Sequence, residues 1–344
     1  MKIFYGVQGT GNGHITRARV MAKALSEEGI EVDFLFTGRP ADKYFDMEIF
    51  NDYQHREGLT FSVESGNVSY FKTALQAKPI TFLQDVKNLD LEGYDLIISD
   101  FEPVTAWAAK RQNKPVLGIG HQYAFKYDVP RSGTDPLAEM FMKYFAPVTQ
   151  GIGLHWYHFN QPILPPIIEL SQATDNSEEN RILVYLPFET PENIMHCLSQ
   201  FSAYQFHVYS PTPFNSEHAH IIYHPLSRES FQQDLQLCSG IISNSGFELA
   251  SEALQSGKKI LAKPLHSQME QISNASALEQ LGYGTTMHDL EIETIAQWLN
   301  DSQRIKITYP NVAKIITRWI KQGMPEITQD FINEIWAEVD VIKL

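Results

Sequence analysis

The sequence contains little cysteine, no long apolar run and a deficit of positive charge. Only two cysteines occur among 344 residues, Cys197 and Cys238, and both lie in apolar surroundings without the spacing of metal ligands. They are expected to be reduced core side chains of a cytoplasmic protein. No apolar run approaches the roughly 20 residues that cross a bilayer, and residues 1–4 enter a short strand rather than a signal peptide. The chain is therefore expected to have no transmembrane segment and to be peripheral at a membrane at most.

Acidic residues outnumber basic ones by 41 to 27, which gives a formal net charge of −14. A nucleic-acid-binding surface needs cations that displace counterions from phosphates, so no nucleic acid is expected as a partner. The sequence also offers no Asp-x-Asp motif and no histidine–glutamate motif of the metal-binding kind. We therefore expect no metal and no other cofactor.

Buried strands alternate with helices in both halves of the chain. Continuous apolar runs separated by helical patterns indicate parallel strands covered on both faces. The predicted strands are residues 3–7, 32–36, 96–99 and 116–119 in the first half, and 182–186, 206–209, 240–242 and 260–262 in the second. The expected fold is α/β, with two tandem Rossmann-like, doubly wound parallel-sheet domains that face each other across a cleft.

A break in this alternation divides the chain into domains. Three prolines between 162 and 166 precede a polar run at 174–180, which is typical of a linker. The expected division is an N-terminal domain at 1–160, a linker at 161–180, a C-terminal domain at 181–322, and a terminal helix at 323–344 that packs back on the N-terminal domain.

A glycine-rich turn, Gly-Thr-Gly-Asn-Gly-His at residues 9–14, follows the first strand. Glycines let the backbone approach a ligand, and the amides that open the next helix attract an anion. The spacing differs from the dinucleotide fingerprint, and the second strand ends in Thr37 and Gly38 rather than in an acid. The alternatives are a nicotinamide enzyme in which Arg39 meets a phosphorylated ribose, and a tight turn without a ligand. The candidate ligand contacts in the turn are Gly11, Asn12 and Gly13.

His14 opens the first helix of the chain. The positive end of the helix dipole is expected to keep its ring neutral near pH 7, so that it can accept a proton from a hydroxyl. Asp100 ends another strand at the same edge of the sheet and is expected to orient the His14 ring. The alternatives are that His14 caps a turn and that Asp100 caps the helix after Pro103. His121 projects from a third strand end toward the same cleft.

A second polar cluster begins where a strand of the C-terminal half ends, near residue 243. Exposed amides near Ser245 and Gly246 open a helix and are suited to phosphate. Glu248 and Glu252 lie four residues apart on one helical face, and a carboxylate can accept hydrogen bonds from both hydroxyls of a ribose. A solvated helical face after a turn is the alternative. Two further residues, suited to the hydroxyls of a hexose, are Glu270 and Gln271.

Together these residues resemble the glycosyltransferases of the GT-B fold. The resemblance is to the bacterial lipid-linked muramoyl-pentapeptide N-acetylglucosaminyltransferase family and, more distantly, to the UDP-glycosyltransferases of plants. It spans the chain, with residue-level matches in two regions. In these families the N-terminal glycine loop ends in a histidine that is a proposed base, here His14. A glycine six residues before a ribose-binding glutamate falls on Gly246 and Glu252, and the plant signature Asp-Gln-x-x-Asn-Ala is matched by residues 270–275.

The resemblance also implies roles for the remaining candidates. Glu270 and Gln271 would bond hydroxyls of the donor sugar, and backbone atoms at Leu226 would hold the base. Asn244 stands where relatives have a phosphate-contacting histidine or arginine, and the turn at residues 186–190 is poor in glycine. The implied co-substrate is a nucleotide sugar, UDP-linked in these families.

The resulting hypothesis is an inverting, metal-independent glycosyltransferase in which His14 deprotonates the acceptor hydroxyl. A UDP-sugar 2-epimerase of the same fold and a non-catalytic sugar-nucleotide binding protein are the alternatives. His121 is the candidate on the acceptor side. The acceptor is expected to be a saccharide or a lipid-linked molecule, because residues 125–147 combine three cations with an apolar stripe. Such a segment is typical of an interfacial helix, a core helix or a dimer contact.

Overall fold

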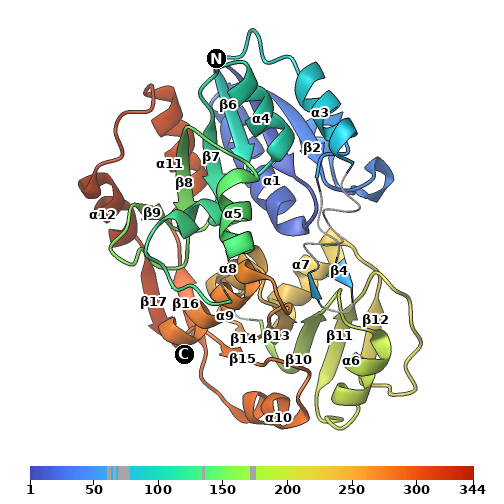
Figure 1. The fold of residues 1–344 in the computed structure, drawn as a ribbon. Coiled ribbons are helices and arrows are strands. Elements are labelled where there is room, and N and C mark those ends of the chain that lie inside the picture. Colours follow the sequence, from blue (N-terminus) through green and yellow to red (C-terminus); the bar gives the residue numbers. More distant parts are fainter. Residues whose placement is uncertain (60–62, 65–66, 69–77, 134–135, 171–175) are drawn as a thin grey trace.

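Two α/β units make up the molecule, with the N-terminal half of the chain (blue to green) above the C-terminal half (yellow to orange) in Figure 1. This computed structural model describes residues 1–59, 63–64, 67–68, 78–133, 136–170 and 176–344. The predicted fold class, with two parallel sheets, is confirmed. Within those ranges, no helix has the length and apolar character that crossing a bilayer requires. Both cysteines are free and buried.

The N-terminal sheet has seven strands in the order β3-β2-β1-β6-β7-β8-β9, all parallel. Strand order reverses between β1 (Lys2–Gln8) and β6 (Leu96–Asp100), so the loops after these strands diverge and leave room for a ligand at the carboxyl edge. The glycine turn follows β1 and Asp100 ends β6, so both lie at this edge. The other strands are β2 (Glu31–Thr37), β3 (Gln54–His55), β7 (Leu117–Gly120), β8 (Gln150–Leu154) and β9 (Ile163–Leu164).

The C-terminal sheet has six parallel strands in the order β12-β11-β10-β13-β14-β15. Its order reverses between β10 (Glu178–Tyr185) and β13 (Cys238–Asn244), which places Asn244 and the residues after it at a second switch point. The other strands are β11 (Gln205–Tyr209), β12 (Ile221–His224), β14 (Lys259–Lys263) and β15 (Thr285–Thr286).

Helices and short turns cover the two sheets. The helices are α1 (Asn12–Glu27), α3 (Pro79–Asn88), α4 (Pro103–Arg111), α5 (Pro136–Tyr144), α6 (Pro191–Leu198), α7 (Arg228–Leu237), α8 (Phe247–Gln255), α9 (Met269–Leu281), α10 (Ile292–Asn300), α11 (Val312–Lys321) and α12 (Gln329–Ala337). Three 3₁₀ turns are η1 (Ala41–Lys43), η2 (Glu48–Phe50) and η3 (His121–Lys126). Two antiparallel pairs are β4 (Val63–Glu64) with β5 (Asn67–Val68), and β16 (Ile305–Thr308) with β17 (Asp340–Lys343).

The N-terminus of α4 settles one of the alternatives for Asp100. The side chain of Glu102 caps this helix, accepting hydrogen bonds from the amides of Val104 and Thr105 at 2.7 and 2.6 Å. Because Glu102 satisfies the amides that would otherwise lack partners, Asp100 does not cap this helix. Its carboxylate faces His14 instead.

The chain passes from the N-terminal unit to the C-terminal unit between β9 and β10, returns to the N-terminal unit with α11 and α12, and ends in β17 beside the C-terminal unit. Strand β9 belongs to the N-terminal sheet and β10 begins at Glu178, so the expected linker at 161–180 has strands at both ends; its residues 171–175 lie outside the described ranges. The return toward the N-terminal unit begins at α11 rather than at residue 323, since α11 packs on α1 and Lys321 pairs with Glu28 at 2.8 Å. Trp336 of α12 donates to the carbonyl of Ile163 at 2.7 Å. After α12, β17 pairs with β16, so the segment 323–344 holds a helix and a strand.

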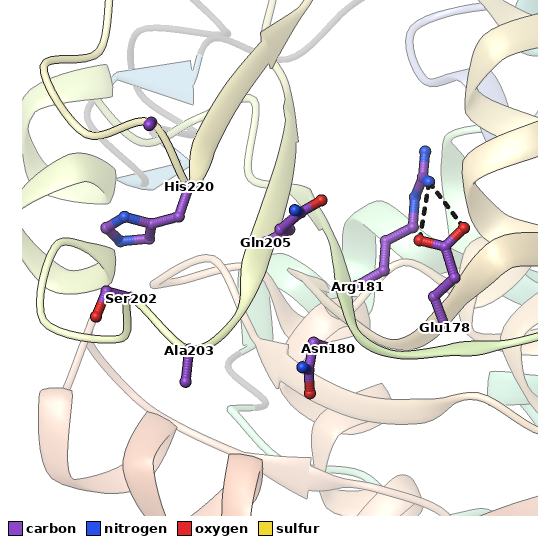
Figure 2. Close-up of a pocket in the computed structure, with 8 residues that line it drawn as sticks. Glu178, Asn180, Arg181, Ser202, Ala203, Gln205 and His220 are labelled. Carbon is purple, nitrogen blue, oxygen red and sulfur yellow. Dashed lines mark hydrogen bonds and ion pairs between the residues drawn. The ribbon is translucent and has the colours of Figure 1, made fainter.

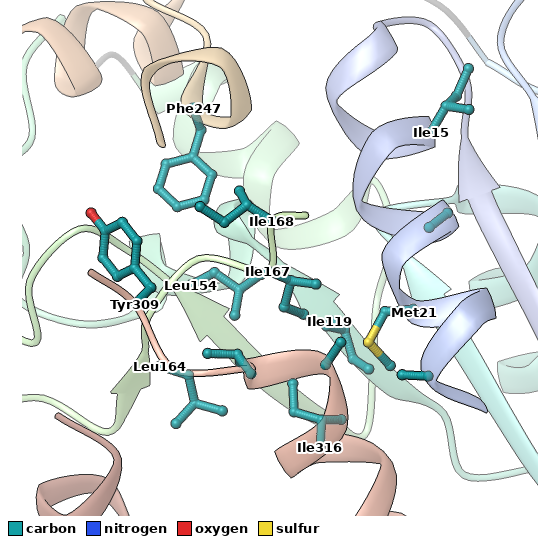
Figure 3. Close-up of a cluster of buried hydrophobic side chains, with 14 of the residues drawn as sticks. Ile15, Met21, Ile119, Leu154, Leu164, Ile167, Ile168, Phe247, Tyr309 and Ile316 are labelled. Carbon is teal, nitrogen blue, oxygen red and sulfur yellow. The ribbon is translucent and has the colours of Figure 1, made fainter. Parts of the chain in front are cut away.

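An apolar cluster joins the two units. Figure 3 shows Ile15 and Met21 of α1, Leu154 of β8, Phe247 of α8 and Ile316 of α11 in this cluster. All five are at most 4% exposed. Burying such side chains is the main favourable term in folding. The carboxyl edges of the two sheets are therefore held against each other by a shared core.

Candidate active site

The site lies where the first turns of α1 and α8 meet. Both helices begin at a glycine, Gly11 for α1 and Gly246 for α8, and neither glycine supplies a side-chain cap. A Cβ added at either position would meet nothing within 4 Å. Within the described part of the chain, no side chain caps the opening amides of either helix, and such amides have the polarity that suits an anion.

Gly13 brings the two helices together. A Cβ on Gly13 would lie 3.0 Å from Cγ of Glu248, which is tighter than ordinary packing. Asn12, beside it, accepts two hydrogen bonds from Arg39, both at 3.1 Å. The three candidates in the glycine turn therefore differ. Gly11 has free space around its Cα, Asn12 is hydrogen-bonded by Arg39, and Gly13 packs against Glu248 of the other domain.

The His14 ring pairs with Asp100, as expected from their positions at two strand ends. Nδ1 of His14 lies 2.7 Å from Oδ1 of Asp100, and the His14 side chain is 16% exposed while Asp100 is fully buried. Burial opposes ionisation of Asp100, but the nearby charge of Arg17 and the hydrogen bonds from His14 and Arg17 lower the pKa of that carboxyl below its ordinary value. An ionised Asp100 orients the ring so that Nε2 points away from it.

Arg17 connects this pair to the C-terminal domain. Its Nε and one terminal nitrogen bond the two oxygens of Asp100 at 2.8 and 2.6 Å, and its other terminal nitrogen bonds Oε1 of Glu248. The three residues are at most 6% exposed. One buried cation therefore serves two carboxylates from different domains. Burial, with Asp100 adding to it and Arg17 opposing it, raises the pKa of Glu248.

Gln122 brings the histidine close to a candidate sugar contact. Its amide nitrogen lies 3.1 Å from both oxygens of Glu270, in the first turn of α9, and 3.5 Å from Nε2 of His14. The proposed base and the acid expected to hold the donor sugar are thus separated by one amide group. This is the juxtaposition that a transfer between two substrates requires.

Polar atoms without partners gather at the end of β13. Among the described residues, Oδ1 of Asn244, Oγ of Ser245 and Oε2 of Glu248 are buried and have no hydrogen-bond partner. A buried polar atom that is left unpaired costs about 1–3 kcal/mol. The amide of Asn244 donates to the carbonyl of Lys263 at 2.9 Å, and Ser245 accepts from Asn274 at 2.9 Å. These unpaired atoms are the groups that a polar ligand would satisfy.

Lys263 supplies positive charge beside Asn244. It ends β14 directly opposite Asn244 in the parallel register, is 3% exposed, and pairs with Glu189 at 2.7 Å. Glu189 belongs to the glycine-poor turn at residues 186–190, so the acid of that turn is neutralised by this lysine.

The remaining donor-side candidates take different positions. Glu252 lies on α8 and accepts from Gln232 of α7 at 3.0 Å, and burial raises its pKa to about 7. Oε1 of Gln271 accepts from the amide of Leu265 at 2.9 Å, so this side chain orders its own loop. Leu226 follows β12 and is 37% exposed.

His121, the candidate on the acceptor side, is buried between the two domains. The ring is 1% exposed, its Nδ1 lies 2.8 Å from the carbonyl of Leu154, and its Nε2 lies 2.6 Å from Oδ1 of Asn274. It also stacks on Phe247 with centroids 4.0 Å apart. Burial lowers its pKa. His121 therefore connects the two domains, and its place on the acceptor side stays a prediction.

The segment expected to meet the acceptor is a helix with two different faces. Met140 and Tyr144 of α5 are 54% and 50% exposed. Phe141 packs on Phe145 with ring centroids 4.4 Å apart and approaches Phe101 at 6.4 Å. One face thus joins the core while the other is open.

A pocket of about 380 Å³ lies elsewhere in the C-terminal domain. It is lined by the first residues of β10 and by residues that precede or begin β11 and β12, including Arg181, Gln205 and His220 (Figure 2). These are the amino ends of the strands, whereas ligands of such sheets bind beyond the carboxyl ends. The pocket is therefore separate from the candidate active site.

Three site residues escaped the reasoning from sequence. Arg17 follows His14 by three residues on the same helical face, a spacing that suggests proximity. Lys263 ends a predicted strand, as Asp100 does. Gln122 follows His121 with no signal in the sequence.

Two doubly wound domains whose carboxyl edges meet at a histidine–aspartate pair define a glycosyltransferase of the GT-B fold. The model of the family described as glycosyl transferase family 1 matches residues 1–302, so the chain belongs to this family and is a glycosyltransferase. No curated protein sequence matches the chain significantly.

Solved structures share the fold over the whole chain. The glycosyltransferase SsfS6 of Streptomyces sp. SF2575, complexed with thymidine diphosphate, has a TM-score of 0.58 and 12% identity, covering 94% of this chain and 99% of that chain. MurG of Acinetobacter baumannii has a TM-score of 0.54 and 14% identity, with 98% and 99% covered. SnogD of Streptomyces nogalater has a TM-score of 0.52 and 15% identity, with 98% and 99% covered.

Proposed function

We propose that the protein transfers a sugar from a UDP-linked donor to an acceptor hydroxyl with inversion at the anomeric carbon, without a metal ion or other cofactor. The observation that carries this proposal is the His14–Asp100 pair at 2.7 Å, with Nε2 of His14 close to the group that Gln122 forms with Glu270. The pair joins a proton acceptor of the N-terminal domain to the donor side of the cleft.

His14 acts as the base. With its Nδ1 held by ionised Asp100, the ring carries its lone pair on Nε2 and accepts the proton of the acceptor hydroxyl as that oxygen attacks the anomeric carbon. Asp100 stabilises the imidazolium that forms. Attack from the face opposite the leaving nucleotide inverts the configuration. The shared core that packs the domains together limits the access of water to the donor.

The leaving diphosphate is stabilised by groups of the C-terminal domain. The opening amides of α8 after Gly246 and the hydroxyl of Ser245 donate to phosphate oxygens, and Lys263 brings a positive charge beside Asn244. Fixed donors of this kind are effective because they need no reorganisation as charge develops.

The rest of the donor is held by residues at the same edge. Glu252 accepts from the ribose hydroxyls, the backbone at Leu226 meets the base, and Glu270 and Gln271 bond the sugar. The N-terminal glycine turn contacts the sugar diphosphate of the donor through Gly11, Asn12 and Gly13. SsfS6, the relative complexed with thymidine diphosphate, supports a nucleoside diphosphate as the donor moiety.

The acceptor is proposed to be a saccharide or a lipid-linked molecule that approaches from the N-terminal domain. The open face of α5, with Met140 and Tyr144, supports an apolar portion in that molecule. Both classes therefore belong in the acceptor panel.

The test is the rate of UDP release from UDP-sugars in the presence of saccharide and lipid-linked acceptors. We expect His14→Ala to lower kcat by roughly 10²–10⁴-fold, the usual contribution of a general base, while the affinity for UDP stays within about twofold. His196→Ala is the control, because His196 is an exposed histidine in the last turn of α6 and belongs to none of the elements that carry the site. Full activity of His14→Ala would remove His14 from the mechanism. Release of an epimerised or free sugar without any acceptor would favour the 2-epimerase instead.

A further inference from the structure

A second cluster of histidine and carboxylate lies on the face of the C-terminal sheet that α7 covers. It contains His207 of β11, His224 at the end of β12, and Asp234 of α7. These three elements are adjacent at the edge of the sheet, where β12 is the outermost strand. The proposed transfer reaction uses none of the three side chains.

The ligand atoms of this cluster form a compact triangle. Nδ1 of His207 lies 2.9 Å from Nε2 of His224 and 3.4 Å from Oδ2 of Asp234, and the third side of the triangle measures 3.8 Å. Tetrahedral coordination at 2.0–2.1 Å from each ligand places ligand atoms about 3.3 Å apart. The three separations scatter around that value.

Neighbouring groups orient the ligands. Tyr209 donates to Oδ2 of Asp234 at 2.6 Å, and Arg181 bonds the other oxygen, so the carboxylate is fixed and retains a lone pair on Oδ2. The ring of His224 lies nearly parallel to that of Tyr209, at 15° with centroids 4.9 Å apart. Hydrogen bonds of this kind to a ligating carboxylate are a regular feature of metal sites.

The local charge and access also suit a cation. Arg181 is itself paired with Glu178, drawn with dashed lines in Figure 2, so its charge is shared between two carboxylates. The side chains of His207 and Asp234 are 8% and 7% exposed, but that of His224 is 25% exposed. The His224 side gives an entry path and room for a water molecule as a fourth ligand.

We propose that His207, His224 and Asp234 bind a divalent transition-metal ion, with Zn²⁺ the best match to two imidazoles and one carboxylate. The ion ties β11, β12 and α7 together at the edge of the C-terminal domain. His224 lies two residues before Leu226, where the base of the donor is proposed to rest. The ion acts on the structure of that strand end and takes no part in the chemistry of transfer.

Cobalt(II) titration of the full chain tests the site, because Co²⁺ replaces Zn²⁺ in such ligand sets and absorbs visible light. The protein is first stripped with a chelator and dialysed. One Co²⁺ per chain is expected to give a visible absorption band that Zn²⁺ abolishes. His224→Gln should weaken Co²⁺ binding at least about tenfold, and Tyr209→Phe, which removes only the hydroxyl that orients Asp234, by about tenfold.

His266→Gln is the matched control, since it alters an exposed histidine–carboxylate pair and should bind Co²⁺ as the wild type does. Circular dichroism of each variant confirms that the fold is intact. The proposal is overturned if the wild type gives no visible band, or if His224→Gln and His266→Gln bind Co²⁺ equally well. Because the readout is independent of sugar transfer, its failure leaves the proposed function untouched.

Discussion

At the scale of single residues, the site is governed by one buried cation placed between two buried carboxyl groups. Arg17 satisfies Asp100 with two hydrogen bonds and still reaches Glu248. Removing one member of such a group leaves a buried charge uncompensated, which typically destabilises a protein by about 3–5 kcal/mol. Arg17 is therefore a positioning residue: it keeps Asp100 ionised, and through Asp100 it sets the orientation of His14.

The sequence could predict His14 and Asp100, because each follows or ends a strongly apolar strand and parallel strands share one carboxyl edge. It could not predict the burial of Arg17, whose second partner lies 231 residues away. The contact of His121 with Asn274 was unpredictable for a similar reason, since Asn274 belongs to the other domain. Contacts between domains depend on how the two units dock, which no local pattern contains.

The proposed role of Glu252 predicts that the affinity for nucleotide depends on pH. Burial raises its pKa to about 7, so the carboxylate that we propose to accept from the ribose hydroxyls is lost as the pH falls through 7. If only the ionised form binds, UDP should bind about tenfold more weakly at pH 6 than at pH 8, as measured by titration calorimetry. Glu252→Gln should bind weakly and equally at both values. Wild-type affinity that is equal at pH 6 and 8 would contradict the role of Glu252.

The same ionisation affects stability with the opposite sign. The folded protein holds the Glu252 proton up to about pH 7, whereas the unfolded chain releases it near the ordinary glutamate pKa of 4.5. The folded state binds more protons in this range, so raising the pH from about 5 to 8 lowers the stability of the nucleotide-free protein. Glu252→Gln lacks this ionisable group. The free energy of unfolding in urea, measured from pH 5 to pH 8, should therefore fall more steeply with pH for the wild type than for Glu252→Gln.

At the scale of elements, the close approach of α1 and α8 builds the site. Gly13 permits it, because any side chain there meets Glu248. The core strands were predictable, since runs such as those of β1 and β13 are apolar without interruption. Strands of two residues, such as β9 and β15, could not be predicted, because so short a segment shows no hydrophobic periodicity. The β16–β17 pair also escaped, since its strands are separated by two helices.

Gly13→Ala tests this contact. The added Cβ would lie 3.0 Å from Cγ of Glu248 and force the two helices apart, and overpacking of this kind destabilises by about 1–3 kcal/mol. Alanine is otherwise the better helix former, so a loss of stability in urea unfolding reports the contact alone. Lys23→Ala is the control, because Lys23 is exposed on the same helix and its replacement should change stability by less than about 0.5 kcal/mol. Equal stability of Gly13→Ala and the wild type would contradict the close packing of α1 on α8.

At the scale of the whole molecule, the two α/β units are packed together because α11 and α12, near the end of the chain, lie against the N-terminal unit. Helix α11 packs on α1, and Trp336 of α12 is bonded to β9. The apolar cluster of Figure 3 takes residues from both halves of the chain. The expected division into two domains therefore describes the sheets, while the core between them is shared.

A shared core predicts a single unfolding transition in calorimetry. Ile316→Ala removes a side chain that is 1% exposed in this core and should destabilise by about 2–5 kcal/mol, shifting the whole transition while it stays single. Ile49→Ala, at a position 41% exposed, should have an effect below about 0.5 kcal/mol. Two separate transitions, of which Ile316→Ala shifts only one, would show that the domains unfold independently.

The measurement that most directly tests the nucleotide-sugar site is a thermal-shift series with UDP, dTDP, GDP, CDP, NAD and NADP, run on the wild type and on Glu252→Ala. A ligand at about 100 times its dissociation constant adds about 2.7 kcal/mol to the folded state, which is a readable shift. We predict that UDP raises the Tm of the wild type and leaves that of Glu252→Ala unchanged. A shift with dTDP alone would support the nucleotide site but show that the base is thymine rather than uracil. The proposed donor site between β13, α8 and the glycine-rich turn at residues 9–14 would be contradicted by two results. One is no shift with any nucleoside diphosphate, and the other is a shift with NAD or NADP alone.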